Sequence, residues 1–314
     1  MIKKTELLVA PKQLAEIELL AVAGADAFVV GDARFALCGH SSVQESHLLE
    51  AISSAHARRK RLYLLADALM PNALLTEFAV YLQQVKHLPF DGIRVADIGA
   101  YWLVREIIPT VAVHLVDAMM LTNYETVNYW ATKGVKRVRL AHELTYDEVL
   151  AIKSAATPEV EVLIQGAPLM FTSRRQLLNN YLTYQRPIAE NVIVTQDDSF
   201  LFDKDRNLYY PLVENLHGTH IYGGNDVCMI DELGPLLTAG IDALYIEGFT
   251  YETEKLVEIV KLYQMAIQLA TVESEKYAKA GLALYNEVVK LQPKRRQTDR
   301  GFYYKPTIYK NQSR

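Results

Sequence analysis

Cysteine is nearly absent from this sequence of 314 residues, which contains only Cys38 and Cys228. Two cysteines cannot form a disulfide framework, a CxxC zinc site, or the full thiolate set of an iron–sulfur cluster held within one chain. His217 and His220 precede Cys228, but a His-x-x-His spacing in a glycine-rich segment is weak evidence for a metal site. The sequence therefore predicts no metal ion.

Long apolar runs and a strong excess of either charge are also missing. Nowhere do about 18 uncharged apolar residues follow one another, as a membrane-spanning helix requires. The first residues, MIKKTELLVAP, contain only a short apolar run that holds a glutamate, so they do not resemble a secretory signal peptide. The net charge of −4 gives no overall case for nucleic-acid binding, and 50% of the residues are apolar. We expect a globular, cytoplasmic protein without membrane contacts.

Strand-like and helix-like patterns alternate along the chain with unusual regularity. A glycine followed by one or two polar residues and a β-branched run, as at Gly24, Gly134 and Gly240, is typical of the turn into a strand of a parallel sheet. Eight such strands with short connections favour an α/β fold of the TIM-like (β/α)8 barrel type over a doubly wound sheet. The expected strands are residues 6–11, 24–31, 61–67, 91–97, 111–117, 136–143, 160–166 and 242–248.

The eighth strand follows a long gap, which divides the chain into three parts. We expect the barrel over residues 1–166 and 241–292, and an inserted β-containing region over residues 167–240, between strands seven and eight. The inserted region should contain a β-hairpin, because two aromatic runs flank the turn-forming residues 203–207. Residues 293–314 form a basic, aromatic tail with seven Lys and Arg against one Asp, a net charge of +6 that leaves −10 on the remaining chain.

Polar residues follow most of the expected strands, and in a barrel such positions meet at one end, where we place the functional site. They are Asp32, Asp67, Asp97, Asp117, Glu143, Gln165 and Glu247. Aspartate at a strand end often caps the next helix, so we interpret Asp32, Asp67 and Asp97 as caps. Glu143 and Glu247 are the candidate catalytic residues, a carboxylate pair suited to acid–base chemistry or to binding a hydroxyl group.

Other polar residues are candidates for ligand binding. Ser173, Arg174 and Arg175 follow the seventh strand and suit an anion, such as an RNA phosphate or a carboxylate. The alternative is that the two arginines pair with acidic loop residues. The remaining candidate ligand-binding residues are Asp117, His142, Asn225 and Asp226. His114 lies inside an alternating strand, which indicates a core or lumen residue of the barrel.

The tail interleaves cations with aromatic side chains. Its cations Lys294, Arg295 and Arg296 precede a group of aromatic residues, Phe302, Tyr303, Tyr304 and Tyr309. Proteins that bind single-stranded RNA combine these two residue types. The alternative is a tail that closes over the barrel. The sequence has no Ser-His-Asp order, HExxH helix or phosphate-binding glycine loop in a convincing context.

Several segments, taken in order, resemble peptidase family U32, the collagenase-like peptidases, over nearly the whole chain. They are ELLVAP at residues 6–11, GADAFVVG at 24–31, LAHEL at 140–144, NNYL at 179–182, THIYGGNDVCMIDEL at 219–233 and AGIDALYIEG at 239–248. The resemblance implies a TIM-like barrel with an inserted β region. It also implies a divided function. Some members are called collagenases or proteases, others support hydroxylation, including 5-hydroxyuridine formation at the wobble position of tRNA, and several bind a 4Fe–4S cluster.

The chain departs from the family pattern at the cluster. Glu161 and the Gly166–Ala167 pair match the pattern, but Leu169 and Gln176 stand where the family has cysteines. Cys228 matches a position that holds a cluster cysteine in some members, and a single thiolate there cannot hold four irons. The resemblance is therefore to a short branch without the cluster cysteines, and we expect no Fe–S cluster and no other cofactor. His142 also stands where the family more often has arginine.

Three functional hypotheses follow from the resemblance. The first is tRNA wobble-uridine hydroxylation beside a paralogous U32-family subunit that retains the cysteines, with tRNA and a small carboxylate such as prephenate as ligands. The second is a peptidase, for which the sequence offers no activated nucleophile. The third is a non-catalytic scaffold or binding subunit.

Overall fold

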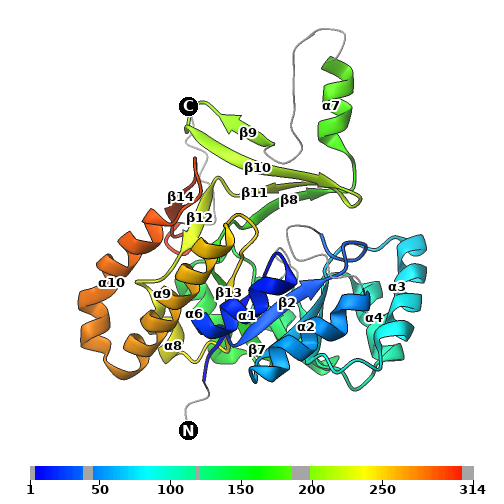
Figure 1. Ribbon diagram of the computed structural model, residues 1–314, viewed down its shortest axis with the longest axis horizontal. Coiled ribbons are helices and arrows are strands. Elements are labelled where there is room, and N and C mark those ends of the chain that lie inside the picture. The colour runs from blue at the N-terminus through cyan, green and yellow to red at the C-terminus, as the bar shows by residue number, and fades with distance from the viewer. Residues whose placement is uncertain (1–3, 38–44, 117–120, 186–198, 306–314) are drawn as a thin grey trace.

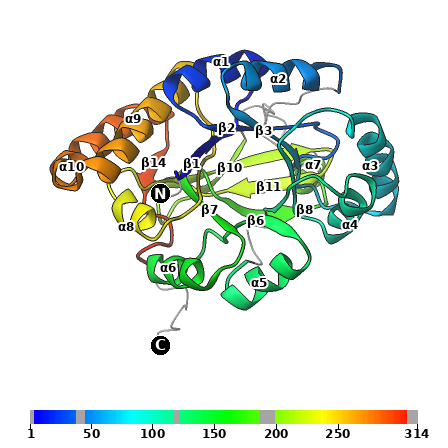
Figure 2. The same ribbon diagram turned by 90° about the horizontal axis from the view of Figure 1, so that it is seen from below.

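The computed structural model describes residues 4–37, 45–116, 121–185 and 199–305. Eight of the described strands form a closed, parallel barrel, because β13 pairs with both β1 and β7. Figure 2 shows the strands as a ring with helices around it. The predicted (β/α)8 barrel is confirmed. Its strands are β1 (Glu6–Val9), β2 (Ala27–Gly31), β3 (Arg61–Ala66), β4 (Gly92–Val95), β5 (Val113–Leu115), β6 (Val135–Arg139), β7 (Glu159–Gly166) and β13 (Ala243–Ile246).

Helices cover the outside of the barrel, and some of them begin at residues whose side chains cap the helix. The Asp97 carboxylate accepts a hydrogen bond from the Ala100 backbone N–H, and Thr145 with Glu148 forms a capping box. The outer helices are α1 (Leu14–Ala23), α2 (Glu45–Ala57), α3 (Asn72–Val85), α4 (Ile98–Ile107), α5 (Tyr124–Thr132), α6 (Tyr146–Ala155), α8 (Leu233–Thr238), α9 (Thr253–Val272) and α10 (Ser274–Lys290). None of the helices in the described ranges is long and apolar enough to cross a membrane.

Alternate residues of each strand face the two sides of the barrel wall. Leu7, Val9 and Leu244 belong to the large apolar core between the strands and the helices. Leu8, Val29 and Tyr245 belong to a smaller cluster formed by the opposite strand faces, inside the barrel. The outer side of the barrel wall therefore belongs to the large apolar core, and only a small apolar cluster lies inside the lumen.

Charged side chains fill part of this lumen. Arg94 and Glu161 are fully buried and make two hydrogen bonds of 2.8 and 2.6 Å. Arg137 is buried as well and bonds to Glu6 on β1. His114 is buried in the lumen, as expected from the sequence. Burial and the nearby arginines lower its pKa well below the usual value, so the ring is neutral.

A second, antiparallel sheet lies across one end of the barrel, and helix α7 (Leu177–Gln185) projects beside it (Figure 1). The predicted hairpin is present, with Asn207 in the left-handed conformation (φ 51°) in its turn. His217 joins this sheet to the barrel through a 2.8 Å contact with the Ala33 carbonyl, beyond the end of β2. The sheet strands, in spatial order, are β8 (Leu169–Ser173), β11 (Gly218–Tyr222), β10 (Leu208–Asn215) and β9 (Phe200–Asp203).

The chain then returns to the barrel through β12 (Asn225–Cys228), which pairs antiparallel with the end of β7. The tail adds β14 (Gln297–Asp299) parallel to β12. Beyond it, the Tyr303 hydroxyl donates a hydrogen bond of 3.0 Å to the Leu163 carbonyl, and the Tyr304 ring stacks on Tyr146. The described part of the tail therefore packs against the protein, and its aromatic residues 303 and 304 are held by these contacts.

Candidate functional site at the barrel mouth

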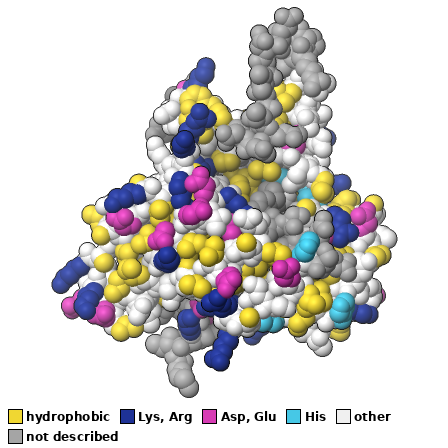
Figure 3. Space-filling model, viewed as in Figure 1, with side chains coloured by type: hydrophobic (Ala, Val, Ile, Leu, Met, Phe, Trp, Pro, Cys, Tyr) yellow, Lys and Arg dark blue, Asp and Glu magenta, His cyan; other side chains and the backbone are white. Residues whose placement is uncertain are grey.

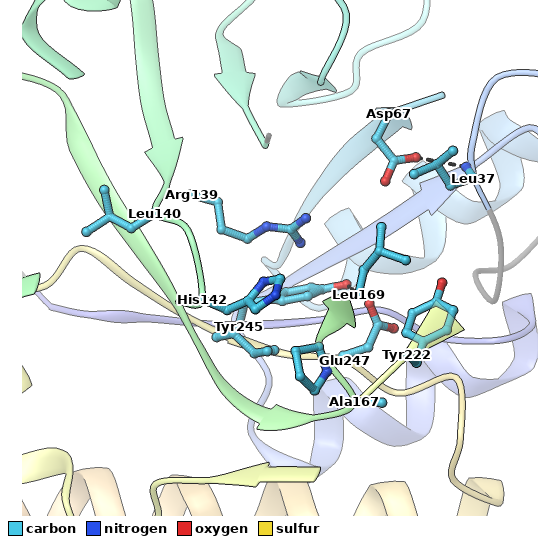
Figure 4. A pocket seen from close by; sticks show the side chains of 12 residues that line it. Leu37, Asp67, Arg139, Leu140, His142, Ala167, Leu169, Tyr222, Tyr245 and Glu247 are labelled. Atoms are coloured by element: carbon cyan, nitrogen blue, oxygen red, sulfur yellow. Dashed lines mark hydrogen bonds between the residues drawn. The ribbon is translucent and has the colours of Figure 1, made fainter. Parts of the chain in front are cut away.

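A small pocket opens at the carboxyl ends of the barrel strands, beneath the second sheet. Its space of about 40 Å³ holds roughly three water molecules, enough for a small group such as a carboxylate. Side chains from β3, β6, β13 and the segments after them point into this space (Figure 4). The lining residues are Leu37, Asp67, Arg139, Leu140, His142, Leu163, Ala167, Pro168, Leu169, Tyr222, Tyr245 and Glu247.

Arg139 supplies a positive charge to the pocket. It is the last residue of β6, and its guanidinium lies 5.0 Å from the centre of the Tyr245 ring. Its Nη2 donates a hydrogen bond of 3.2 Å to the Val116 carbonyl. Within the described ranges it forms no ion pair with a carboxylate. Its charge is therefore available to an anionic ligand.

His142 follows β6 and stands beside Arg139. Burial, and after it the positive charge of Arg139, together lower the pKa of His142 to about 4. The imidazole is therefore neutral near pH 7, with one nitrogen able to donate and the other able to accept a hydrogen bond.

Glu247 brings a carboxylate to the pocket from the end of β13. The residue is 7% exposed, and its Oε2 accepts a hydrogen bond of 2.8 Å from the Tyr245 hydroxyl. Gly166 allows the close approach of β7 at this point, because it has φ +106° and a side-chain carbon there would lie 2.3 Å from the Glu247 carbonyl oxygen. The end of β7 therefore packs directly against the backbone of Glu247, whose N–H also donates a hydrogen bond of 2.9 Å to the Gln165 carbonyl.

The structure brings together only some of the residues that the sequence predicted. Glu247 and His142 line the pocket, whereas Glu143 is exposed and outside the lining. The expected pair of carboxylates at one site is therefore not formed by Glu143 and Glu247. Asp117 lies outside the described residues.

Ser173, Arg174 and Arg175 lie at the turn between β8 and α7, away from the pocket lining. Both arginines are exposed, and no described carboxylate pairs with either one. The Ser173 hydroxyl accepts a hydrogen bond of 3.2 Å from the Arg175 backbone N–H, which makes it part of the turn. The alternative to anion binding, ion pairs of these arginines with acidic loop residues, is not seen in the described part of the chain.

Asn225 and Asp226 hold the tail and do not line the pocket. Asp226 is fully buried, and its carboxylate forms an ion pair with Arg296 and accepts a hydrogen bond of 2.6 Å from the Tyr251 hydroxyl. The Asn225 side-chain amide donates to Asp299 at 3.3 Å. The Asp226 carboxylate has no exposed surface for a ligand and holds the tail, whereas ligand binding by Asn225 stays a prediction.

Sequence reasoning missed several of the pocket residues. Asp67 was expected to cap a helix, but α3 begins after Pro71 and Asp67 accepts a hydrogen bond of 2.9 Å from the Leu37 backbone N–H at the pocket edge. The cap prediction is likewise wrong for Asp32, which bonds to Arg34, and it is confirmed for Asp97. Arg139, Tyr222 and Tyr245 carried no motif. The signal for Arg139 and Tyr245 was the alternation of strand residues, which places one side of each barrel strand inside the barrel. Tyr222 lies on β11 of the second sheet, where this rule does not apply.

The donor set does not fit an iron–sulfur cluster. Cys228 is fully buried on β12, and burial raises the pKa of its thiol to about 11, which favours the neutral thiol over the thiolate that iron requires. Leu169 lines the mouth pocket and Gln176 is exposed, and neither side chain contains a sulfur atom. His217 contacts the Ala33 carbonyl and His220 the Thr172 hydroxyl, each at 2.8 Å, and among the residues that the structure describes no group of three or more His, Cys, Asp and Glu is placed to hold a metal ion.

The fold and this pocket define a (β/α)8-barrel protein with its site at the usual end of such a barrel, the carboxyl ends of the strands. The sequence profile of Peptidase family U32 matches residues 12–313. The chain therefore belongs to peptidase family U32.

Two of the similar proteins within this family are named for tRNA hydroxylation. The chain is 35% identical to tRNA hydroxylation protein P2 of Bacillus subtilis, over 98% of this chain and 100% of that protein. It is 25% identical to tRNA hydroxylation protein P1 of the same organism, over 88% of this chain and 66% of that protein. A solved U32 peptidase is similar at 15% identity, with a TM-score of 0.47, over 78% of this chain and 93% of that one.

Proposed function

We propose that this chain acts in the hydroxylation of the wobble uridine of tRNA, which forms 5-hydroxyuridine. The observation that carries the proposal is the end-to-end match, at 35% identity, to a protein named for tRNA hydroxylation. The family name would suggest a peptidase, but Cys228 is buried with a raised thiol pKa and offers no activated nucleophile.

The pocket at the barrel mouth is the proposed ligand site. Arg139 supplies the positive charge for a carboxylate group, and neutral His142 supplies a hydrogen bond beside it. Glu247 can accept a hydrogen bond from a ligand hydroxyl or exchange a proton with it. The small volume of about 40 Å³ suits the carboxylate end of a ligand such as prephenate, and the rest of the ligand would extend out of the mouth.

The missing sulfur ligands support a second subunit. Leu169 and Gln176 stand where other members of the family have cysteines, so we propose that a cysteine-complete U32 paralogue supplies the cluster chemistry. Two tRNA hydroxylation relatives, P1 and P2, occur together in Bacillus subtilis. This chain is more similar to P2 than to P1, and we propose that its partner corresponds to P1.

The test is mass spectrometry of tRNA nucleosides from a strain that lacks this gene. We expect 5-hydroxyuridine and its derivatives to disappear and to return with the wild-type gene, but not with Arg139→Gln or Glu247→Gln. Glu275→Gln, an exposed substitution on α10, is the matched control and should restore the nucleosides. Unchanged nucleosides in the deletion strain would refute the proposal. If both pocket variants restore the nucleosides fully, the pocket is not the functional site, and the chain would act only as a scaffold.

A further inference from the structure

A larger cavity, separate from the mouth pocket, lies between the second sheet and the start of the tail. Its volume is about 450 Å³, enough for a nucleotide-sized group. We call it the sheet–tail cleft. It is lined by Ser199, Phe200, Tyr209, Pro211, Leu212, Val213, Phe249, Thr250, Pro293, Lys294, Arg295 and Arg296. These residues come from β9, β10, the loop after β13 and the segment before β14.

The charge of the cleft indicates an anionic ligand. Three of its lining residues are cations and none is acidic, although the chain as a whole carries a net charge of −4. Arg296 is committed to Asp226 and to the Gly223 carbonyl at 3.0 Å. Lys294 and Arg295 are exposed and have no carboxylate partner among the described residues. Two positive charges therefore remain for a ligand.

Aromatic rings lie directly beside these charges. Phe200 on β9 is 41% exposed, and its ring centre lies 4.9 Å from that of Tyr209 on β10. The Arg295 guanidinium lies 5.6 Å from both ring centres. In Figure 3, Lys and Arg side chains lie next to hydrophobic ones in the region where Figure 1 places β9, β10 and β14.

The backbone at Arg295 is shaped for this arrangement. Its φ of 65° is left-handed, a conformation that is uncommon and costs free energy in a residue other than glycine. The following residue, Arg296, is anchored to buried Asp226, so the tail cannot shift freely. The strain is thus held by an ion pair one residue away, and the Arg295 side chain is kept over the two rings.

The cleft lies next to the barrel mouth. Phe249 lines the cleft and Tyr222 lines the mouth pocket, and their ring centres are 4.4 Å apart. This pair of rings is a shared wall, so a chain bound in the cleft would place its neighbouring groups close to the mouth.

We propose that the sheet–tail cleft binds one unpaired nucleotide of the RNA substrate, with its base against Phe200 and Tyr209 and its phosphate at Lys294 and Arg295. Base stacking on aromatic rings beside cations is how single-stranded RNA is held without base-specific contacts. The tail takes part through its cations, whereas its aromatic residues 303 and 304 are packed against Leu163 and Tyr146. The inference rests on the proposed function for the identity of the RNA as tRNA, and the binding itself is measured separately.

The test is fluorescence anisotropy with the full chain and a labelled uridine oligonucleotide of about ten residues. We expect Lys294→Gln/Arg295→Gln to weaken binding by about tenfold or more at low salt, and to reduce the salt dependence by about 0.7 per lost phosphate contact. Phe200→Leu should weaken binding by about fivefold or more and leave the salt dependence unchanged. Two matched controls, Lys276→Gln/Lys279→Gln on α10 and Tyr124→Leu on α5, change exposed residues outside the cleft and should bind like the wild type.

The outcomes separate this inference from the proposed function. No binding by the wild type, or equal affinity of wild type and cleft variants, would overturn the cleft even if deletion of the gene abolishes 5-hydroxyuridine. An equal loss in the α10 control would also overturn it, because binding would then follow net charge alone. Specific loss in the cleft variants with unchanged tRNA nucleosides in the deletion strain would keep the RNA site and refute the proposed function. Circular dichroism melting of each variant checks its folding, and Phe200→Leu stands as the second, charge-neutral variant.

Discussion

Arg94 and Glu161 face each other across the interior of the barrel, where neither side chain has any exposed surface and two hydrogen bonds of 2.8 and 2.6 Å join them. Glu161 is the glutamate that matches the family pattern, and the structure gives it a role inside the barrel. Arg94 is the counter-charge of Glu161. Removing either residue would leave the other charge buried and unpaired, which is costly in free energy.

We predict that Arg94→Met lowers the free energy of unfolding by about 3 kcal/mol, because it leaves the Glu161 carboxylate buried without its main partner. The double variant Arg94→Met/Glu161→Met should recover most of this loss. Urea unfolding followed by circular dichroism measures both effects. Equal stability of the wild type and the single variant would contradict the role of the pair.

The tail should detach when its anchor is removed. We predict that Asp226→Asn exposes residues 293–305 to limited proteolysis, because it weakens the ion pair with Arg296 and the hydrogen bond from Tyr251. Cleavage sites are read by mass spectrometry. Lys305→Gln, which removes an exposed ion pair with Asp299, is the control and should leave the tail as resistant as in the wild type. Equal resistance of Asp226→Asn would show that other contacts are sufficient.

Stability should depend on pH through His142. The pKa of His142 is about 4 in the folded chain and has its ordinary value of 6.5 in the unfolded chain. Between pH 4 and pH 6.5 the unfolded chain therefore binds the proton more readily than the folded chain. The contribution of neutral His142 to the free energy of unfolding is therefore fully present above pH 6.5 and is lost as the pH falls toward 4. His114 has a lowered pKa and acts in the same direction. We predict that His142→Gln reduces the loss of stability between pH 7 and pH 5 in urea unfolding, and an unchanged loss would disprove the assignment.

Glu143 offers a direct comparison with Glu247. The sequence suggested both as catalytic residues, but only Glu247 lines the pocket. We predict that Glu143→Gln restores tRNA 5-hydroxyuridine in the deletion strain to at least about half of the wild-type level, whereas Glu247→Gln does not. Nucleoside mass spectrometry measures both. Loss with Glu143→Gln in a folded protein would return this residue to the site.

Cys228 should be chemically inert in the folded chain. It is fully buried, and its thiol pKa is raised to about 11 by burial. In a Cys38→Ser background we expect no alkylation by iodoacetamide at pH 8 without denaturant and complete alkylation in urea, both read by intact mass. Rapid alkylation of the folded chain would contradict the burial and reopen the question of a reactive thiolate.

Much of the fold follows from local sequence patterns. The repeated glycine, polar and β-branched phrase at Gly24, Gly134 and Gly240 predicted parallel strands, and these strands form the barrel. The hairpin at residues 203–207 was predictable from its turn residues. The long gap before the eighth strand predicted the inserted β region, which the family resemblance also implies, while the division of the chain at residues 166, 240 and 292 stays a prediction. The chain after residue 224 shows why boundaries are difficult, since β12 pairs with β7 of the barrel.

The site was predictable only in part. Strand periodicity and the barrel rule located the mouth and selected Glu247 and His142. Neither rule could show that Asp226 lies buried beneath the tail, because its partner Arg296 is 70 residues further along the chain. Arg139 was missed because it looks like a surface residue in a strand whose charged residues, Lys136, Arg137 and Arg139, are all cations.

The sequence by itself determined the order of strands and helices, the polar ends of the strands and the absence of a sulfur ligand set, because each of these depends on residue types and their local spacing. The tertiary structure decided which polar residues meet. Closing the barrel brought Arg139 and Glu247 to one pocket, left Glu143 outside it, and placed the tail cations beside Phe200 and Tyr209. Those choices depend on strand register and on contacts between distant segments, which are set by packing of the whole chain.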